Sequence, residues 1–229
     1  MDETPKFFFN VKNWETDDFI ILGSVTAATI GLIQIDNDIR DILIKNNLNH
    51  QTEFLDFGKA WGEPLVTLPI SAGLYFHGLI SEDKSTRRVG FEVFQSFVYT
   101  GIVTALLKGA IGRARPYMNL SSKKFKPFNA KNDFNSLPSG HTSVAFSLST
   151  VLSNNFENNY LKAAAYLPAF ITAYSRMSYN KHWLSDVFLG AVIGYFVGNF
   201  VHNLHEESSG LIETNISQFN VINIQMSLN

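Results

Sequence analysis

A histidine and an aspartate stand at a spacing that can activate an imidazole. His182 and Asp186 are four residues apart, so on a helix their side chains face the same way. A carboxylate placed there accepts a hydrogen bond from one ring nitrogen and leaves the other free and more nucleophilic. The pair follows Ser175-Arg176, which adds a cation to the cluster. The plain alternative is an ordinary ion pair at a helix end.

A second cluster, Pro138-Ser139-Gly140-His141, has the residues of an anion-binding helix start. Proline suits the first turn of a helix, and Gly140 lets a ligand approach the backbone closely. Free amides at that helix start, together with the Ser139 hydroxyl, would form a cradle in which the helix dipole favours an anion. The alternative is a capped helix start with His141 nearby by coincidence.

A third cluster places two cations near the end of an apolar segment. Lys108 and Arg115 are seven residues apart, which is about two helical turns, and Pro116 follows directly. The two cations can therefore share a helix face before the proline stops the helix. A structural alternative is that both side chains reach toward lipid headgroups from a membrane helix.

Taken together, the clusters resemble the type 2 phosphatidic acid phosphatase superfamily. The family pattern is Lys-x6-Arg-Pro, then Pro-Ser-Gly-His, then Ser-Arg-x5-His-x3-Asp, and every fixed position is matched between Lys108 and Asp186. The first hundred residues resemble the family only in their apolar pattern. The resemblance implies an all-helical bundle, no metal cofactor, and hydrolysis of phosphomonoesters or pyrophosphates.

The resemblance also implies a role for each matched residue. His182 would attack phosphorus and form a phosphohistidine, with Asp186 orienting its ring. His141 would protonate the leaving oxygen and then act as base for the hydrolytic water. The oxygens of the phosphate would be held by Lys108, Arg115, Arg176, Ser139 and the amides around Gly140. Arg113 lies outside the family pattern, and we interpret it as auxiliary electrostatics or a headgroup contact.

The apolar segments predict the fold class: all-α, a six-helix membrane bundle with the active site at one end of the helices. The polar, Lys-rich stretch 112–137 is predicted to be a long loop. Gly190, Gly194 and Gly198 recur every four residues, a pattern typical of closely packed membrane helices. The six predicted helices cover approximately residues 19–35, 65–80, 91–111, 138–152, 161–177 and 183–204.

Some features of the sequence argue against membrane crossing by these helices, and others favour it. Some segments are nearer 16 than the roughly 20 residues that a span needs, and the mean hydropathy is only +0.02. However, the segments have no continuous polar stripe, and Trp61, Tyr160 and Trp183 flank them as interfacial residues would. These features favour six spans within one phosphatase domain, residues 1–205, followed by a polar, loosely attached tail, residues 206–229.

Composition excludes several classes of function. The net charge is -2 with no long basic run, which argues against a nucleic-acid partner. Without cysteine the chain has no disulfide, thiolate zinc site or thiol nucleophile. Residues Met1 to Trp14 are polar and lack the pattern of a secretory signal. The predicted partners are a lipid phosphate and a membrane, no cofactor or metal is predicted, and the oligomeric state stays open.

The sequence leaves four functions open. The leading one is a multi-pass membrane phosphatase acting on phosphatidic acid, phosphatidylglycerophosphate or a polyprenyl pyrophosphate. For this function the resemblance implies a bacterial inner membrane with an extracytoplasmic active site. The others are a broad-specificity soluble acid phosphatase, a vanadate-dependent haloperoxidase, and a membrane scaffold without activity.

Overall fold

A computed structural model describes residues 15–46, 52–129 and 131–226, with residues 207–226 described for their backbone alone. The regular elements in these ranges are helices, as predicted, and an isolated bridge joins Arg113 to Phe125. In chain order the elements are α2 (Thr16–Lys45), α3 (Glu53–Trp61), α4 (Pro64–Ile80), α5 (Lys84–Ile111), η2 (Pro116–Met118), η3 (Asn132–Phe134), α6 (Gly140–Asn154), α7 (Asn159–Ala164), α8 (Leu167–Ser178) and α9 (Leu184–Met226).

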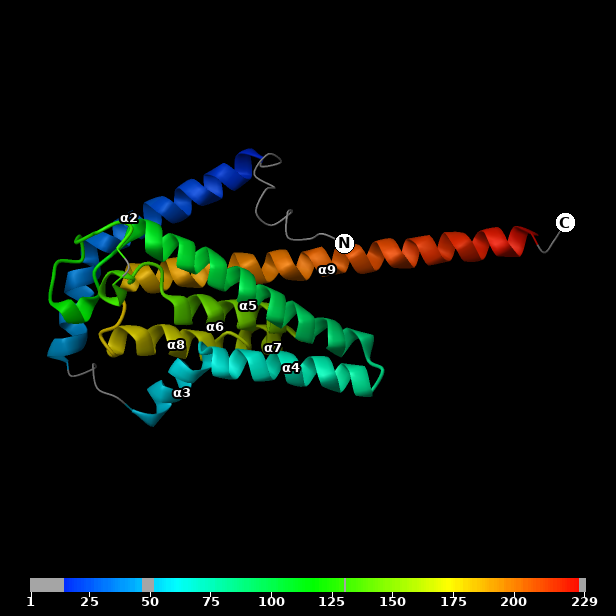
Figure 1. Ribbon diagram of the computed structural model, residues 1–229, viewed down its shortest axis with the longest axis horizontal. Helices are drawn as coiled ribbons and strands as arrows, with labels where there is room; N and C mark the ends of the chain where they lie inside the picture. The colour runs from blue at the N-terminus through cyan, green and yellow to red at the C-terminus, as the bar shows by residue number, and fades with distance from the viewer. Residues whose placement is uncertain (1–14, 47–51, 130, 227–229) are drawn as a thin grey trace.

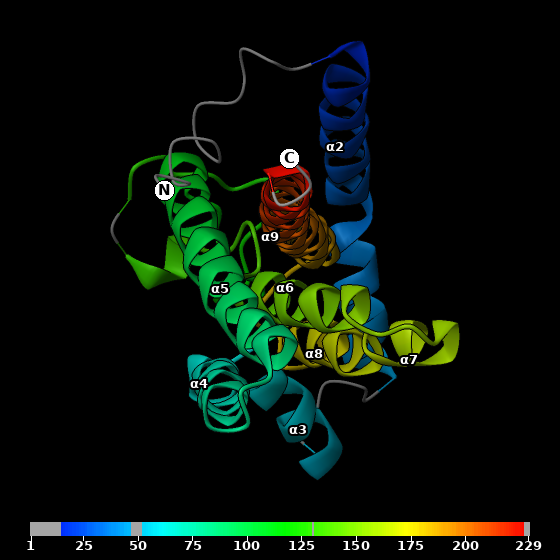
Figure 2. The same cartoon turned by 90° about the vertical axis from the view of Figure 1, so that its right-hand side faces the viewer.

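Helix α6 is the centre of the bundle, and most of its residues are buried. It packs against α5, α8 and α9, while α4 packs on α5 and α2 on α9 (Figure 2). Many of the buried α6 side chains are small and hydroxylated, such as Ser143, Ser147 and Thr150. Small residues let neighbouring backbones approach closely, so α6 is enclosed on several sides.

Glycines on α9 allow the closest of these approaches. A β-carbon added at Gly194 would lie 2.2 Å from the carbonyl oxygen of Ser143, and one at Gly198 would lie 2.7 Å from Cβ of Thr150. The glycine spacing in the sequence therefore marks the face of α9 that meets α6.

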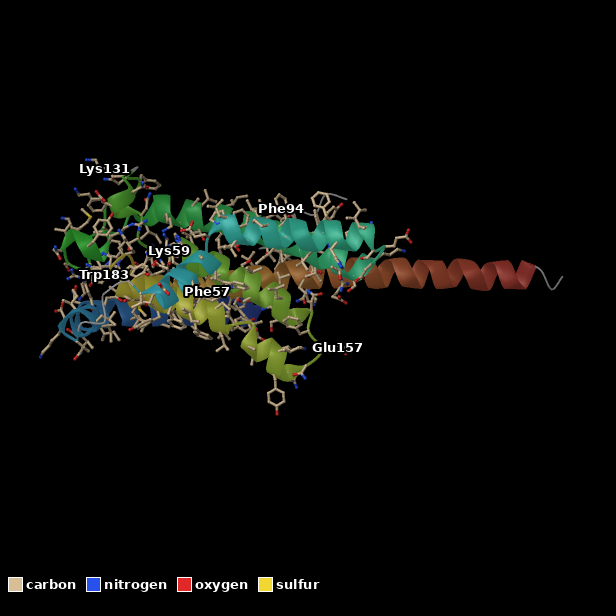
Figure 3. The ribbon with its side chains drawn as sticks, turned by 90° about the horizontal axis from the view of Figure 1, so that it is seen from below. Phe57, Lys59, Phe94, Lys131, Glu157 and Trp183 are labelled. Carbon is tan, nitrogen blue, oxygen red and sulfur yellow. The ribbon has the colours of Figure 1, made fainter. Side chains whose placement is uncertain are left out.

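Four helix ends meet at one end of the bundle. The C-terminal ends of α5 and α8 and the N-terminal ends of α6 and α9 lie together on the left of Figure 1, beside α2. The segment between α5 and α6 covers this end. In Figure 3, Trp183 and Lys131 lie there, and Glu157 lies toward the opposite end.

Helix lengths separate the elements into two groups. Among the described residues, three helices are long and apolar enough to cross a membrane: α2, α5 and the part of α9 from Leu184 to Glu206. Helix α4 is apolar but shorter, with 17 residues, and α6 and α8 have 15 and 12. Five of the six predicted segments coincide with one helix each and the segment 161–177 covers two, whereas six membrane crossings stay a prediction.

Several predicted boundaries differ from the structure. Helix α2 does not end near Asp36 but continues to Lys45, because Asp36 is buried and paired inside the protein. The predicted helix 161–177 is divided into α7 and α8, and Pro168 lies in the first turn of α8. Helix α3, which was not predicted, lies in the polar stretch before α4.

The C-terminal helix extends beyond the predicted phosphatase domain, residues 1–205. Helix α9 continues past the predicted end at Leu204 to Met226, and this part of its backbone projects away from the other helices (Figure 1). The polar segment Met1 to Trp14 lies outside the described residues.

Candidate active site

Asp186, in the first turn of α9, is fully buried, and its hydrogen bonds connect the motif clusters of the sequence to one another. Its Oδ2 accepts hydrogen bonds from the backbone amide of Trp183, at 2.9 Å, and from the hydroxyl of Ser136. Its backbone carbonyl accepts a hydrogen bond from the amide of Ser139, also at 2.9 Å. The start of α9 and the start of α6 are therefore fastened together at this residue.

His182 lies directly before α9, not on it as predicted, and still faces Asp186. Its Nδ1 is 3.5 Å from Oδ2 of Asp186, and the residue is only 4% exposed. Burial lowers the pKa of His182 to about 3; the positive charges of Lys108 and Arg115 act in the same direction, and Asp186 opposes them. The ring is therefore neutral near pH 7, with Nε2 as the nitrogen turned away from the carboxylate.

The two cations of the first cluster are held in different ways. Lys108 lies in the last turn of α5, where its Nζ donates to the carbonyl of Asn135 at 2.6 Å. Arg115 does not share the helix face as predicted, because α5 ends at Ile111 and Gly112 turns the chain with a positive φ of 61°. A β-carbon at Gly112 would collide with the carbonyl of Lys126, so only glycine fits this turn. Nε of Arg115 instead donates to the carbonyl of Asn132 at 3.0 Å.

The start of α6, where the sequence predicts an anion-binding cradle, differs from that prediction in two respects. The helix begins at Gly140, two residues after Pro138, and the Ser139 amide is bonded to Asp186 and so is not a free donor. The hydroxyl of Ser139 lies 2.9 Å from that of Thr142. The Lys108 side chain reaches this helix start, since its Cε is 3.7 Å from where a β-carbon of Gly140 would lie. The first amides of a helix have no intrahelical acceptor, which suits a phosphate oxygen.

Arg176 and His141 complete the predicted set. Arg176 is 5% exposed, and its buried Nε has no hydrogen-bond partner in the described part of the chain. Such an orphaned charged donor is costly unless a ligand satisfies it. His141 follows Gly140 on α6, and its Nε2 lies 3.2 Å from Oε1 of Glu63.

Arg113 is fully buried, so its interpretation as a headgroup contact is wrong. Its Nη1 donates to Oδ1 of Asp186 and its Nη2 to Oδ2 of Asp36, both at 2.7 Å. Asp36 also accepts hydrogen bonds from the amide and hydroxyl of Ser185. Sequence reasoning missed both Asp36 and Glu63, since each is a single acidic residue far from the motifs.

A small recess opens on the α2 side of His182. Its walls include Ile39, Arg40 and Leu43 of α2 and Met177 at the end of α8. Arg40 donates to the side-chain oxygen of Asn180 at 2.8 Å and so ties α2 to the segment that carries His182. Helix α2 therefore forms one wall of the recess beside His182.

Comparison with known proteins places this arrangement in a family. Residues 90–209 match the PAP2 superfamily, and this match covers more than half of the chain. The all-helical fold, the matched motifs and this similarity define the class, and the chain belongs to the PAP2 superfamily.

Two proteins similar in sequence are named lipid A 1-phosphatases, and a solved structure is similar in fold. The chain is 42% identical over 176 residues to a lipid A 1-phosphatase of Porphyromonas gingivalis, and 31% identical over 111 residues to a lipid A 1-phosphatase of Rhizobium johnstonii. These alignments cover 76% and 46% of this chain but only 36% and 43% of the relatives, so the chain spans less than half of their length. The crystal structure of Aquifex aeolicus LpxE is similar in fold, with a TM-score of 0.54 at 24% identity, covering 73% of this chain and 94% of that one.

Proposed function

We propose that the protein is a membrane phosphatase that removes phosphate from a lipid through a phosphohistidine on His182. The observation that carries the proposal is the gathering of His182, His141 and three motif cations at one end of an apolar helical bundle. Membership of the PAP2 superfamily and the three membrane-length helices support it.

In the first step, Nε2 of His182 attacks phosphorus and the bond from phosphorus to the lipid oxygen breaks. His141 donates its proton to that oxygen. The leaving group is an alcohol when the substrate is a phosphomonoester and a lipid monophosphate when it is a pyrophosphate. Asp186 fixes the orientation of the attacking ring and offsets the positive charge that develops on it. The depressed pKa of His182 supports this role, because the attacking nitrogen must be unprotonated.

In the second step, water attacks phosphorus and the phosphorus–nitrogen bond breaks. His141, now without its proton, accepts one from the water, and inorganic phosphate is released. After the two steps, His141 and His182 are therefore back in their starting states. A histidine suits the acid–base role because its imidazole can both donate and accept a proton at a ring nitrogen.

The phosphate oxygens would be held by Lys108, Arg115 and Arg176 and by the first amides of α6. Fixed donors of this kind stabilise the charge that moves during phosphoryl transfer. The unpartnered Nε of Arg176 is a donor suited to such an oxygen. Three fixed cations supply the charge that a metal ion supplies in other enzymes, so we propose a metal-independent reaction.

The substrate class follows from the surroundings of the site and the names of the relatives. Apolar helices next to the site suit a lipid whose acyl part stays in the bilayer. Lipid A 1-phosphate joins phosphatidic acid, phosphatidylglycerophosphate and polyprenyl pyrophosphate as a candidate, because two relatives are named for that reaction. The proposed arrangement has six spans and an extracytoplasmic site in a bacterial inner membrane.

The test is phosphate release by detergent-purified protein from these four lipids and from p-nitrophenyl phosphate, all in EDTA. We expect turnover of at least one lipid, its loss in His182→Ala, and acid-labile phosphate on the protein after a quench. Folding of the variant is checked by its thermal unfolding. Activity confined to the soluble ester would favour an acid phosphatase, and full activity in His182→Ala would overturn the proposed nucleophile.

A further inference from the structure

Glu63 is the carboxylate that contacts the second histidine of the site. It stands between α3 and α4, outside the residues that match the family, and its Oε1 lies 3.2 Å from Nε2 of His141. The sequence motifs assign no partner to His141. The structure therefore places a carboxylate on each of the two site histidines, Asp186 on His182 and Glu63 on His141.

The backbone around Glu63 is fixed against α6 and α8. A β-carbon on Gly62 would lie 2.3 Å from the carbonyl oxygen of His141, so only glycine allows this turn to touch α6. Trp61 donates from Nε1 to the hydroxyl of Ser149 on α6 at 3.2 Å. The hydroxyl of Thr172 on α8 donates to the carbonyl of Gly58. These contacts hold the backbone that carries Glu63 close to His141.

The charges around Glu63 keep it ionised. Although burial opposes them, the hydrogen bond with His141 and the charges of Lys59 and Arg176 hold the pKa of the Glu63 carboxyl below its ordinary value. The Lys59 Nζ lies 3.7 Å from Oε1 of Glu63. An ionised carboxylate on one ring nitrogen fixes the tautomer of the ring and stabilises its protonated form, as in serine hydrolase triads.

We infer that Glu63 is a positioning residue that holds the proton of His141 on Nε2 and so leaves Nδ1 to exchange a proton with the substrate. This inference rests on the proposed function. During the first step Nδ1–H gives its proton to the leaving oxygen, and during the second step bare Nδ1 takes one from water. The bond between Glu63 and Nε2–H persists through both steps.

The test separates proton donation from general damage. With enzyme in excess over substrate, a single turnover reports only the first step, as release of the leaving alcohol. We expect Glu63→Gln to slow release from an alkyl lipid phosphate by about 10- to 100-fold. Release of p-nitrophenol, which needs no proton, should slow by less than about threefold. Glu53→Gln, the same change at an exposed position of α3, should leave both rates unchanged.

A second variant keeps the result interpretable. In a His141→Ala background, Glu63→Gln should cause no further loss, because the group that it positions is absent. Equal slowing of both substrates by Glu63→Gln, an added loss in the His141→Ala background, or no slowing at all would each overturn the inference. The proposed function would still stand in those cases, because its own test depends on His182→Ala.

Discussion

The guanidinium of Arg113 donates to the carboxylate of Asp36 at 2.7 Å, and both side chains are fully buried. This ion pair connects α2, which lies outside the residues that match the family, to the segment that follows α5. Because Arg113 also bonds Asp186, the position of the site carboxylate depends on a residue of α2.

We expect Asp36→Ala to destabilise the protein by about 3–5 kcal/mol, since it leaves the Arg113 charge buried with one partner fewer. Activity should also fall, because Arg113 and Ser185 both lose a bond near Asp186. Thermal unfolding and phosphate release in detergent measure the two effects. Asp38→Ala is the control, as Asp38 is exposed two residues further along α2. If the two variants unfold at the same temperature, the ion pair does not anchor the site.

Burial of a neutral His182 makes stability depend on pH. Its folded-state pKa is about 3, below the unfolded value of about 6.5, so below pH 6.5 the unfolded chain binds a proton that the folded protein does not. The free energy of unfolding should therefore fall by about 1.4 kcal/mol for each pH unit between 6.5 and 3 on account of this group. The check is thermal unfolding at pH 7.5 and 5.0 for the wild type and His182→Gln. The variant should lose less stability on acidification, and an equal loss would contradict a buried neutral ring.

The absence of cysteine allows a direct test of the proposed topology. Lys131 and Glu157 are exposed and lie toward opposite ends of the bundle (Figure 3). In active single-cysteine variants in spheroplasts, a membrane-impermeant maleimide should label Lys131→Cys at once. Glu157→Cys should be labelled only after detergent is added. The reverse pattern would place the site in the cytoplasm, and immediate labelling of both would argue against a membrane crossing by α6.

The motif residues could be identified from the sequence because their spacing is local. Four residues separate His182 from Asp186, and the turn before α9 brings them together even though His182 is not helical. Most helices were also predictable in place, since five predicted apolar segments coincide with one helix each and the sixth, 161–177, covers two. Local pattern was insufficient where the chain turns: Gly112 ends α5 before Arg115, and Pro168 marks the division between α7 and α8.

Long-range partners could not be predicted in the same way. Asp36 directly follows the predicted segment 19–35, and the predicted helix stops before it because a carboxylate is ordinarily too costly to bury without a known partner. That partner, Arg113, is 77 residues away in sequence. Glu63 likewise can be recognised as a site residue only from its contact with His141, 78 residues further along the chain. A single sequence holds no signal that links such positions.

The packing of α9 on α6 gives a final prediction, about how precisely the two histidines must be held. A β-carbon at Gly194 would lie 2.2 Å from the Ser143 carbonyl oxygen and 2.8 Å from the Ser147 amide, both backbone atoms. Gly194→Ala must therefore push α6 away from α9, at a cost of about 1–3 kcal/mol. Since α6 carries His141 and α9 follows His182, phosphate release should fall together with the unfolding temperature. Gly101→Ala is the matched control, because Gly101 lies on α5 with open space where its β-carbon would be; it should be no less stable than the wild type and fully active. Full activity in Gly194→Ala would mean that the site tolerates a shift of α6, and the close contact at Gly194 would then serve stability alone.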